Sequence, residues 1–269
     1  MSLFGETVVV TGFGPFSQYL VNPSWTVAQG LKAEGLEEGT EIYIKEIPVS
    51  YSSAKQILSG IWEKVHPEFA VHLGIAPGSK AIALEQTGKN YGYKSRDVCG
   101  QCPFNHCCVE GGMDKLDSVI NMRSLTKKLK AKGLDVIYSK DAGSRYLCDF
   151  AYYYSLHCGR GRAAFIHLPT SGGLAAPERL VAQLRTIIQA MLTELRGLSE
   201  GTVARTVDHS LPQECPQQLI QHSQSPSIIQ AMLTELRGLS EGTAAPTVDH
   251  ALPQECPQQL MQRSQSPPM

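Results

Sequence analysis

The sequence predicts an α/β domain over residues 1–200, built as a three-layer α/β/α sandwich around a mostly parallel, twisted sheet. Apolar, strand-like runs alternate with segments of helical periodicity through this region, which is the pattern of a sheet covered by helices on both faces. All aromatic residues lie at or before Phe165, so the last 104 of the 269 residues contain none. The hydrophobic content of 42% is ample for a core in the first part of the chain.

The first half of this domain contains three predicted strands and two predicted helices. Strands are expected at 6–11, 41–49 and 69–75, and the last of these is nearly continuously apolar, as buried parallel strands usually are. A helix is expected over 23–34, with Asn22 or Ser24 as N-cap and Gly35 after its end. A second helix over 52–65 follows from apolar residues at helical spacing.

The second half begins with an apolar segment at 81–84 and an irregular region over 88–112. Helices are then expected at 116–132, ended by Gly133, and at 146–157, with strands at 134–138 and 163–168. Residues 177–198 form an amphipathic helix that closes the domain. Its predicted buried face consists of Leu180, Leu184, Ile187, Ile188, Met191 and Leu195.

The C-terminal part repeats itself. Residues 187–227 recur as 228–268 with six mismatches, which indicates an internal duplication. Two copies are too few for a helical solenoid, which needs about three repeats to bury its faces. Each copy continues into a long stretch rich in Gly, Pro, Gln, Ser and Thr, so residues 201–269 are predicted to be a disordered, low-complexity tail.

Composition narrows the function classes. A net charge of −1 argues against a generally basic surface for nucleic acid, and no apolar run approaches the ~20 residues of a membrane span. The first residues lack the features of a secretory signal, so the eight cysteines are expected to be reduced thiols in a cytoplasmic protein. The oligomeric state is left open.

Three reactive side chains stand at strand ends or just beyond them, where α/β sheets bind ligands. Cys148 falls in the first turn of the predicted helix 146–157, where unpaired N–H groups and the helix dipole favour a thiolate. His167 ends the strand 163–168. If the strands 134–138 and 163–168 are neighbours, about 4.8 Å apart, thiol and imidazole meet as a nucleophile and its base. Glu85 would orient the imidazole.

Each of these residues also has a purely structural interpretation. Cys148 could be a small buried hydrophobic residue, a histidine at a strand end is often structural, and a glutamate closing a strand is usually solvated. Cys158 lies on the apolar stripe of its helix and is predicted to be a packed core thiol. His72 is mid-strand and is expected to belong to the core.

Two further motifs leave alternatives open. The segment from Cys99 to Cys108 contains C-x-x-C and His106, but adjacent Cys107 and Cys108 fit a tetrahedral zinc site poorly, so a surface loop of reduced thiols without metal is favoured. The loop after the first strand, with Phe13 and Phe16, lacks the features of a phosphate loop. Its phenylalanines suit a flat, uncharged ligand or pack onto the core.

Taken together, several blocks resemble the pyroglutamyl peptidase I family of cysteine peptidases, in particular its vertebrate branch. The resemblance runs from about residue 7 to 195. It is carried by VVVTGFGPF at 8–16, VNPSW at 21–25, EIPV at 46–49, LE at 84–85, CCVE at 107–110, DAG at 141–143, RYLCDF at 145–150 and FIHLP at 165–169. So many blocks in family order make the resemblance specific.

The resemblance implies an α/β/α fold and a cofactor-free cysteine omega-peptidase. Such enzymes remove N-terminal pyroglutamate from peptides through a Glu–Cys–His triad, which here would be Glu85, Cys148 and His167. It also implies that Phe13 and Phe16 flank the pyroglutamyl ring. That ring is a neutral lactam, so an aromatic slot without an acidic anchor is chemically sensible.

Three differences from the family pattern support a second hypothesis. Four residues, 144–147, separate the Ala–Gly turn from Cys148, where the family usually has three, so Ser144 makes the segment one residue longer. One extra residue at a helix start would rotate a side chain by about 100°. The strand before that turn is about two residues short, and residues 75–79 depart from the family pattern beside the substrate pocket. The alternative is therefore a catalytically impaired paralogue that binds peptides or a protein partner.

Overall fold

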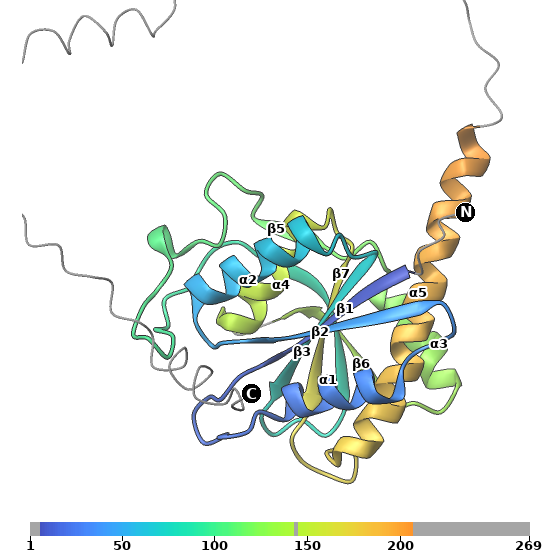
Figure 1. The fold of residues 1–269 in the computed structure, drawn as a ribbon, viewed down its shortest axis with the longest axis horizontal. Helices are drawn as coiled ribbons and strands as arrows, with labels where there is room; N and C mark the ends of the chain where they lie inside the picture. The colour runs from blue at the N-terminus through green and yellow to red at the C-terminus, as the bar shows by residue number, and fades with distance from the viewer. Residues whose placement is uncertain (1–5, 143–144, 207–269) are drawn as a thin grey trace, which may run out of the picture. The chain divides into compact units, whose positions relative to one another are not determined.

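The computed structural model describes residues 6–142 and 145–206, and within them seven strands form one sheet (Figure 1). The strands are β1 (Glu6–Phe13), β2 (Thr40–Ile47), β3 (Phe69–Ala76), β4 (Ile82–Lys89), β5 (Lys115–Asp117), β6 (Val136–Asp141) and β7 (Ala163–Pro169). The order across the sheet is β2-β1-β3-β7-β4-β5, and β6 also pairs with β4.

The sheet is mixed but mostly parallel, which confirms the predicted class. β1 pairs in parallel with β2 and β3, β3 with β7, and β4 with β6. β4 runs antiparallel to both β7 and β5. The predicted apolar segment 81–84 is thus the start of a central strand, and its neighbours on both sides are strands that come later in the chain.

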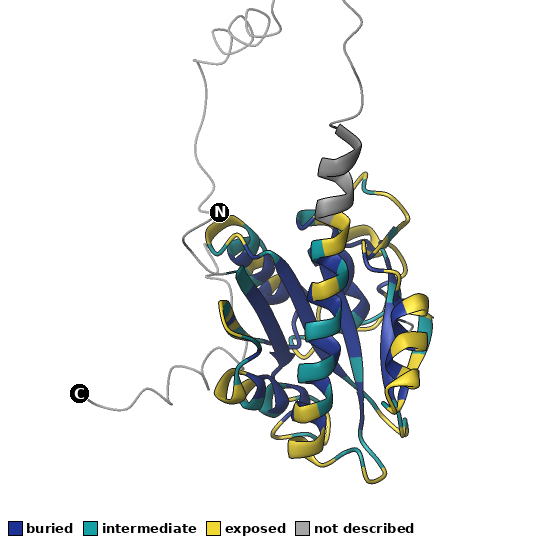
Figure 2. Cartoon of the chain, turned by 90° about the vertical axis from the view of Figure 1, so that its right-hand side faces the viewer, coloured by how far each residue is buried: buried dark blue, intermediate teal, exposed yellow. Residues whose placement is uncertain are grey.

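In the described part of the chain, five α-helices cover the two faces of the sheet, and the two faces have separate cores. The helices are α1 (Pro23–Glu34), α2 (Tyr51–Lys64), α3 (Met122–Ala131), α4 (Leu147–Cys158) and α5 (Pro177–Thr206). Apolar residues of α1, α3 and α5 form one core with one face of the sheet, and those of α2 and α4 form the other (Figure 1). Figure 2 shows the strands buried between helices whose outer faces are exposed.

Helix boundaries follow local capping. The side chain of Asn22 accepts a hydrogen bond from the backbone N–H of Ser24, so Asn22 is the N-cap of α1, one of the two predicted candidates. The helix predicted at 116–132 begins later than expected. Leu116 pairs with Gly88 in the sheet, and Asn121 caps α3 by accepting from the N–H of Ser124. Pairing with β4 therefore overrides the helical pattern over 115–117.

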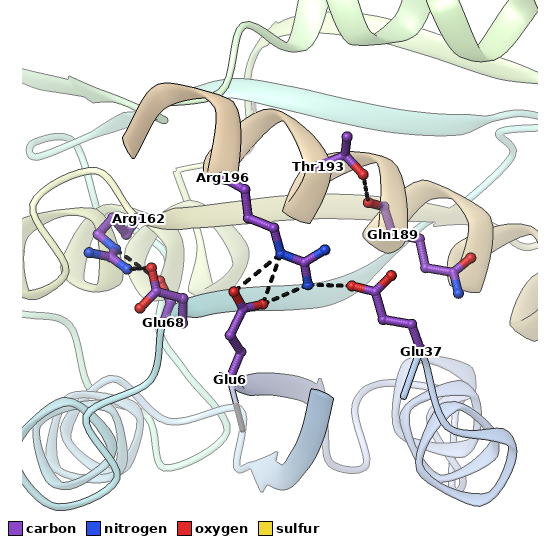
Figure 3. A network of polar contacts seen from close by, with 7 residues as sticks. All are labelled: Glu6, Glu37, Glu68, Arg162, Gln189, Thr193 and Arg196. Atoms are coloured by element: carbon purple, nitrogen blue, oxygen red, sulfur yellow. Dashed lines mark hydrogen bonds and ion pairs between the residues drawn. The ribbon is translucent and has the colours of Figure 1, made fainter. Parts of the chain in front are cut away.

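The helix α5 lies along one face with the predicted apolar residues buried, from Leu180 to Leu195. It continues to Thr206, beyond the predicted end at 198. Arg196 of α5 forms ion pairs with Glu6 at the start of β1 and with Glu37 in the α1–β2 loop (Figure 3). These three side chains are partly exposed, so the network adds little stability by itself.

The predicted low-complexity tail and the internal duplication fall largely outside the part of the chain that the structure describes. Residues 207–269, which contain most of the predicted tail and the second copy of the duplication, lie outside the described residues. None of the helices that the structure describes is long and apolar enough to cross a membrane.

Candidate active site

Strand register brings Glu85 and His167 to one face of the sheet. In the antiparallel pair β4–β7, Ala83 is opposite His167 and Glu85 is opposite Phe165. Because alternate residues of a strand share a face, Glu85 and His167 are diagonal neighbours on the same side. That side is the one under α2 and α4, since Phe165 belongs to the core beneath these helices.

The carboxylate of Glu85 orients the imidazole of His167. Nδ1 of His167 lies 2.8 Å from Oε1 of Glu85, so the N–H at Nδ1 donates to the carboxylate and Nε2 is left for another partner. Glu85 is only 3% exposed, and its Oε2 has no hydrogen-bond partner among the described residues. The imidazole is therefore the main counter-charge of a buried carboxylate.

The same contacts keep His167 protonated at neutral pH. Burial by itself would lower the pKa of this imidazole. Hydrogen bonds with Cys148 and Glu85, together with their negative charges, outweigh burial and raise the pKa of His167 to about 10. A cationic imidazole beside a thiol favours the thiolate form, which is the nucleophilic form of cysteine.

Cys148 is the second residue of α4, which begins at Leu147 with Tyr146 as N-cap. Its Sγ would lie 3.0 Å from a Cβ added to Gly74, and Gly74 is the partner of His167 in the β3–β7 pair. The thiol thus lies over the end of β3, next to the imidazole. Backbone N–H groups in the first turn of α4 face the same region.

The strands leading to Cys148 and His167 are not neighbours, so the condition set out from the sequence is not met. β4 lies between them, since it pairs in parallel with β6 and antiparallel with β7. The two side chains still meet because α4 packs across β4, β7 and β3 and delivers Cys148 to the end of β7. The approach of the two side chains therefore depends on the path of α4 and not on adjacent strands.

The extra residue before the nucleophile does not turn Cys148 away from His167. Ser144 lies outside the described residues, and the residue after it, Arg145, has a left-handed backbone with φ of 49°. Cys148 nonetheless contributes to the raised pKa of His167 and lines the same cavity. β6 runs from Val136 to Asp141, so it begins two residues later and ends three residues later than the strand predicted at 134–138.

Cys148, His167, Phe13 and Phe16 line one cavity of about 690 Å³. Phe13 is 3% exposed and packs on Phe165, whereas the ring of Phe16 lies 5.6 Å from that of Tyr146. Asn22 also lines the cavity, and its side-chain amide donates to the carbonyl of Gly14 at 3.0 Å. The N-cap of α1 therefore fixes the loop that carries the two phenylalanines.

Comparison with known proteins assigns the chain to a family. A profile of the pyroglutamyl peptidase family matches residues 6–199. The chain belongs to this family. Pyroglutamyl-peptidase 1 of Rattus norvegicus is 43% identical over 201 residues, which cover 74% of this chain and 95% of the rat protein. The human pyroglutamyl-peptidase 1-like protein is 45% identical over 162 residues, covering 60% of this chain and 82% of that protein.

Solved structures of the family share the fold. The pyrrolidone carboxyl peptidase of Fervidobacterium islandicum has a TM-score of 0.62 at 28% identity, over 70% of this chain and 99% of that one. The enzyme of Pyrococcus furiosus gives a TM-score of 0.63 at 26% identity over the same shares. The predicted α/β fold and the resemblance to pyroglutamyl peptidases are confirmed.

Several residues of this pyroglutamyl peptidase site carried no recognisable signal in the sequence. These residues are Gly74, Tyr146 and Arg96, which border the nucleophile or the cavity. The segment 75–79, which was expected beside the pocket, contributes Ile75, Ala76 and Pro77 to the lining. A single glycine within an apolar strand usually marks a bulge or a close approach, which is the one hint that could have singled out Gly74. The positions of the others depend on how distant segments meet.

The cysteine-rich loop lies apart from the triad, beside a second cavity of about 300 Å³. Within the described residues, no group of three or more His, Cys, Asp or Glu side chains is placed to hold a metal. Cys102, Cys107 and Cys108 are free thiols, as predicted. The prediction of reduced cysteines is wrong for Cys99, which is disulfide-bonded. Its half-buried position in a surface loop leaves the sulfur accessible to a second thiol.

Two other predictions concern residues outside the chemistry. His72 is fully buried, its Nδ1 lies 2.8 Å from the hydroxyl of Thr11, and burial lowers its pKa to about 3, so it is a neutral core residue as predicted. Cys158 is only partly buried rather than a fully packed core thiol, because it stands at the last turn of α4. Burial still raises the pKa of Cys158.

Proposed function

We propose that this protein is a cysteine-type omega-peptidase that hydrolyses the bond after an N-terminal pyroglutamyl residue. The proposal is carried by one observation: Cys148, the Glu85-oriented His167 and the two phenylalanines Phe13 and Phe16 converge on one cavity. Membership of the pyroglutamyl peptidase family supports the same substrate class.

In this proposal Cys148 is the nucleophile. Its thiolate attacks the carbonyl carbon of the pyroglutamyl residue, and backbone N–H groups at the start of α4 stabilise the oxyanion that forms. As the tetrahedral intermediate collapses, His167 gives its proton to the leaving amine, and a thioester with Cys148 remains. Water then attacks the thioester, His167 takes the water proton, and free pyroglutamate is released.

Glu85 acts through His167. Its hydrogen bond to Nδ1 holds the ring so that Nε2 faces the thiol, and its charge stabilises the imidazolium. The pKa of about 10 for His167 means that its imidazole stays cationic through neutral pH and can give a proton to the leaving amine.

The cavity suits a neutral, flat ring. Phe13, Phe16 and Tyr146 provide aromatic surface. Among the residues that the structure describes, no carboxylate side chain lines this cavity. A peptide with a free ammonium group would leave its charge there without a counter-ion, whereas a lactam has no such charge. Discrimination against ordinary N-termini follows from this lack of an acidic anchor.

We also propose that the protein works in the cytoplasm. A nucleophilic thiolate is lost when it is oxidised, so a reducing compartment suits Cys148. Fractionation of cells expressing the full chain, followed by activity measurement in each fraction, tests this location.

The decisive experiment compares two coumarin amides with the full-length protein. Pyroglutamyl-coumarin amide is expected to be hydrolysed, whereas prolyl-coumarin amide, which has the same ring size but carries an ammonium group, is not. Cys148→Ala should abolish turnover, and Cys102→Ala, which removes another free thiol, should leave it unchanged. Absence of hydrolysis by a folded protein, or equal rates on both amides, would contradict the proposed function.

A further inference from the structure

Two charged residues flank the nucleophile, and neither takes part in the chemistry above. Arg145 precedes Cys148 by three positions, and Asp149 follows it directly. Asp149 is fully buried, and its Oδ1 accepts a hydrogen bond from the backbone N–H of Lys89 at 2.9 Å. The residue after the nucleophile is thus attached to the end of β4, the strand that carries Glu85.

Arg145 ties the other side of the nucleophile to the same segment. Its guanidinium donates to the backbone carbonyl of Tyr91, and its Nε lies 3.8 Å from Oδ2 of Asp149. Gly92 lies beside this side chain, and a Cβ added there would make an ordinary contact of 3.5 Å with Nη1 of Arg145. One side chain therefore contacts both the segment after β4 and the first turn of α4.

The backbone of Arg145 needs such support. Its φ of 49° is in the left-handed region, which a residue with a Cβ adopts only where its surroundings hold it. The planar guanidinium is suited to this task because it presents several donors in a fixed geometry. A residue held at both its backbone and its side chain fixes the direction in which α4 begins.

We infer that Arg145 is a positioning residue that, with Asp149, aims Cys148 at His167. The inference rests on the proposed function, because it assigns Arg145 a part in the same site. It also gives a physical reason why the extra residue before the nucleophile leaves Cys148 in place. The turn is anchored after the insertion, so the helix start is set by contacts of Arg145 rather than by the length of the preceding loop.

The test uses Arg145→Met, which keeps an unbranched apolar chain of similar length and removes the donors. We expect kcat on pyroglutamyl-coumarin amide to fall by about 10- to 100-fold with KM nearly unchanged, because a misplaced nucleophile acts on the chemical step. The rate of alkylation of Cys148 by limiting iodoacetamide, mapped by mass spectrometry, should fall in parallel. Arg123→Met is the matched control, since Arg123 is exposed on α3 and stacks on Tyr138.

Arg145→Lys separates charge from geometry. Lysine keeps the positive charge near Asp149, but it lacks the planar set of donors with which arginine contacts Asp149 and the Tyr91 carbonyl at the same time. It should therefore restore only part of kcat and of the alkylation rate. If Arg145→Met fails to fold, kcat and the alkylation rate of Arg145→Lys are compared with those of the parent protein instead. Parental values of both in Arg145→Lys would overturn the inference.

The two readouts distinguish the two claims. Parental kcat and alkylation rate in folded Arg145→Met would overturn the positioning role while leaving the proposed function intact. If the parent protein shows no turnover at all, the proposed function fails. The alkylation rate then still decides on Arg145, because it reports the environment of Cys148 without any substrate.

Discussion

Gly74 is the position where the structure makes the sharpest prediction. A Cβ added there would lie 2.7 Å from Cζ of Phe165 and 3.0 Å from Sγ of Cys148. Carbon atoms in good contact are about 3.5–4.0 Å apart, so Gly74→Ala must displace one or both neighbours by roughly 0.5–1 Å. The mutation therefore tests how closely the thiol is held.

The displacement falls mainly on the thiol because Phe165 is confined. The ring of Phe165 is fully buried, lies 4.8 Å from the ring of His167, and packs against Phe13. Overpacking of such a site costs about 1–3 kcal/mol of unfolding free energy. A nucleophile that moves by about 1 Å loses roughly 100-fold in kcat. We expect a modest loss of stability and a large loss of activity.

The assay measures kcat and KM on pyroglutamyl-coumarin amide, the alkylation rate of Cys148, and the melting temperature. Gly60→Ala is the matched control, because Gly60 lies in α2 with nothing within 4 Å of an added Cβ. It should raise the melting temperature slightly, through helix propensity, and leave kcat unchanged. Parental kcat and parental alkylation in Gly74→Ala would show that the thiol does not depend on this close approach, and would refute the reasoning.

Three further predictions follow from the site and the chain. Glu85→Gln removes the anion that stabilises the imidazolium, so the pKa of His167 should fall from about 10 and the alkaline limb of the kcat/KM profile should move to lower pH. The raised pKa of His167 contributes stability that is complete below about pH 6.5 and is lost as the pH rises towards 10. Urea unfolding at several pH values should therefore show the largest loss of unfolding free energy in the variant at neutral pH and below. An unmoved alkaline limb would argue against the pair. Asn22→Ala should raise KM more than it lowers kcat, because the loop at Gly14 loses its hydrogen bond to Asn22. Loss of the helix cap should also lower the free energy of unfolding by about 1 kcal/mol. An unchanged KM would contradict this role of Asn22. Deleting residues 207–269, which contain most of the predicted low-complexity tail, should move the melting temperature by only a few degrees when both proteins are measured with a reductant that opens the Cys99 disulfide, and insolubility of the shortened protein would be the contrary result.

The sequence by itself determined the local elements and the chemical identity of the site. Apolar periodicity placed the central strands, Asn22 was a recognisable cap, and Cys148 fell in the first turn of a helix. These features depend on neighbours within a few residues, which is the range over which side-chain spacing and capping act. The matched sequence blocks added Glu85 and His167 as specific candidates.

The tertiary structure decided how those elements meet. β4 entered the centre of the sheet as an antiparallel strand, and its register with β7 put Glu85 diagonally across from His167. The pairing of β4 with β5 shortened the helix predicted at 116–132, because residues 115–117 extend the sheet. Strand order and register are set by contacts between distant segments, so local periodicity does not specify them. For the same reason Gly74 acquired its position beside Cys148 only in the folded chain.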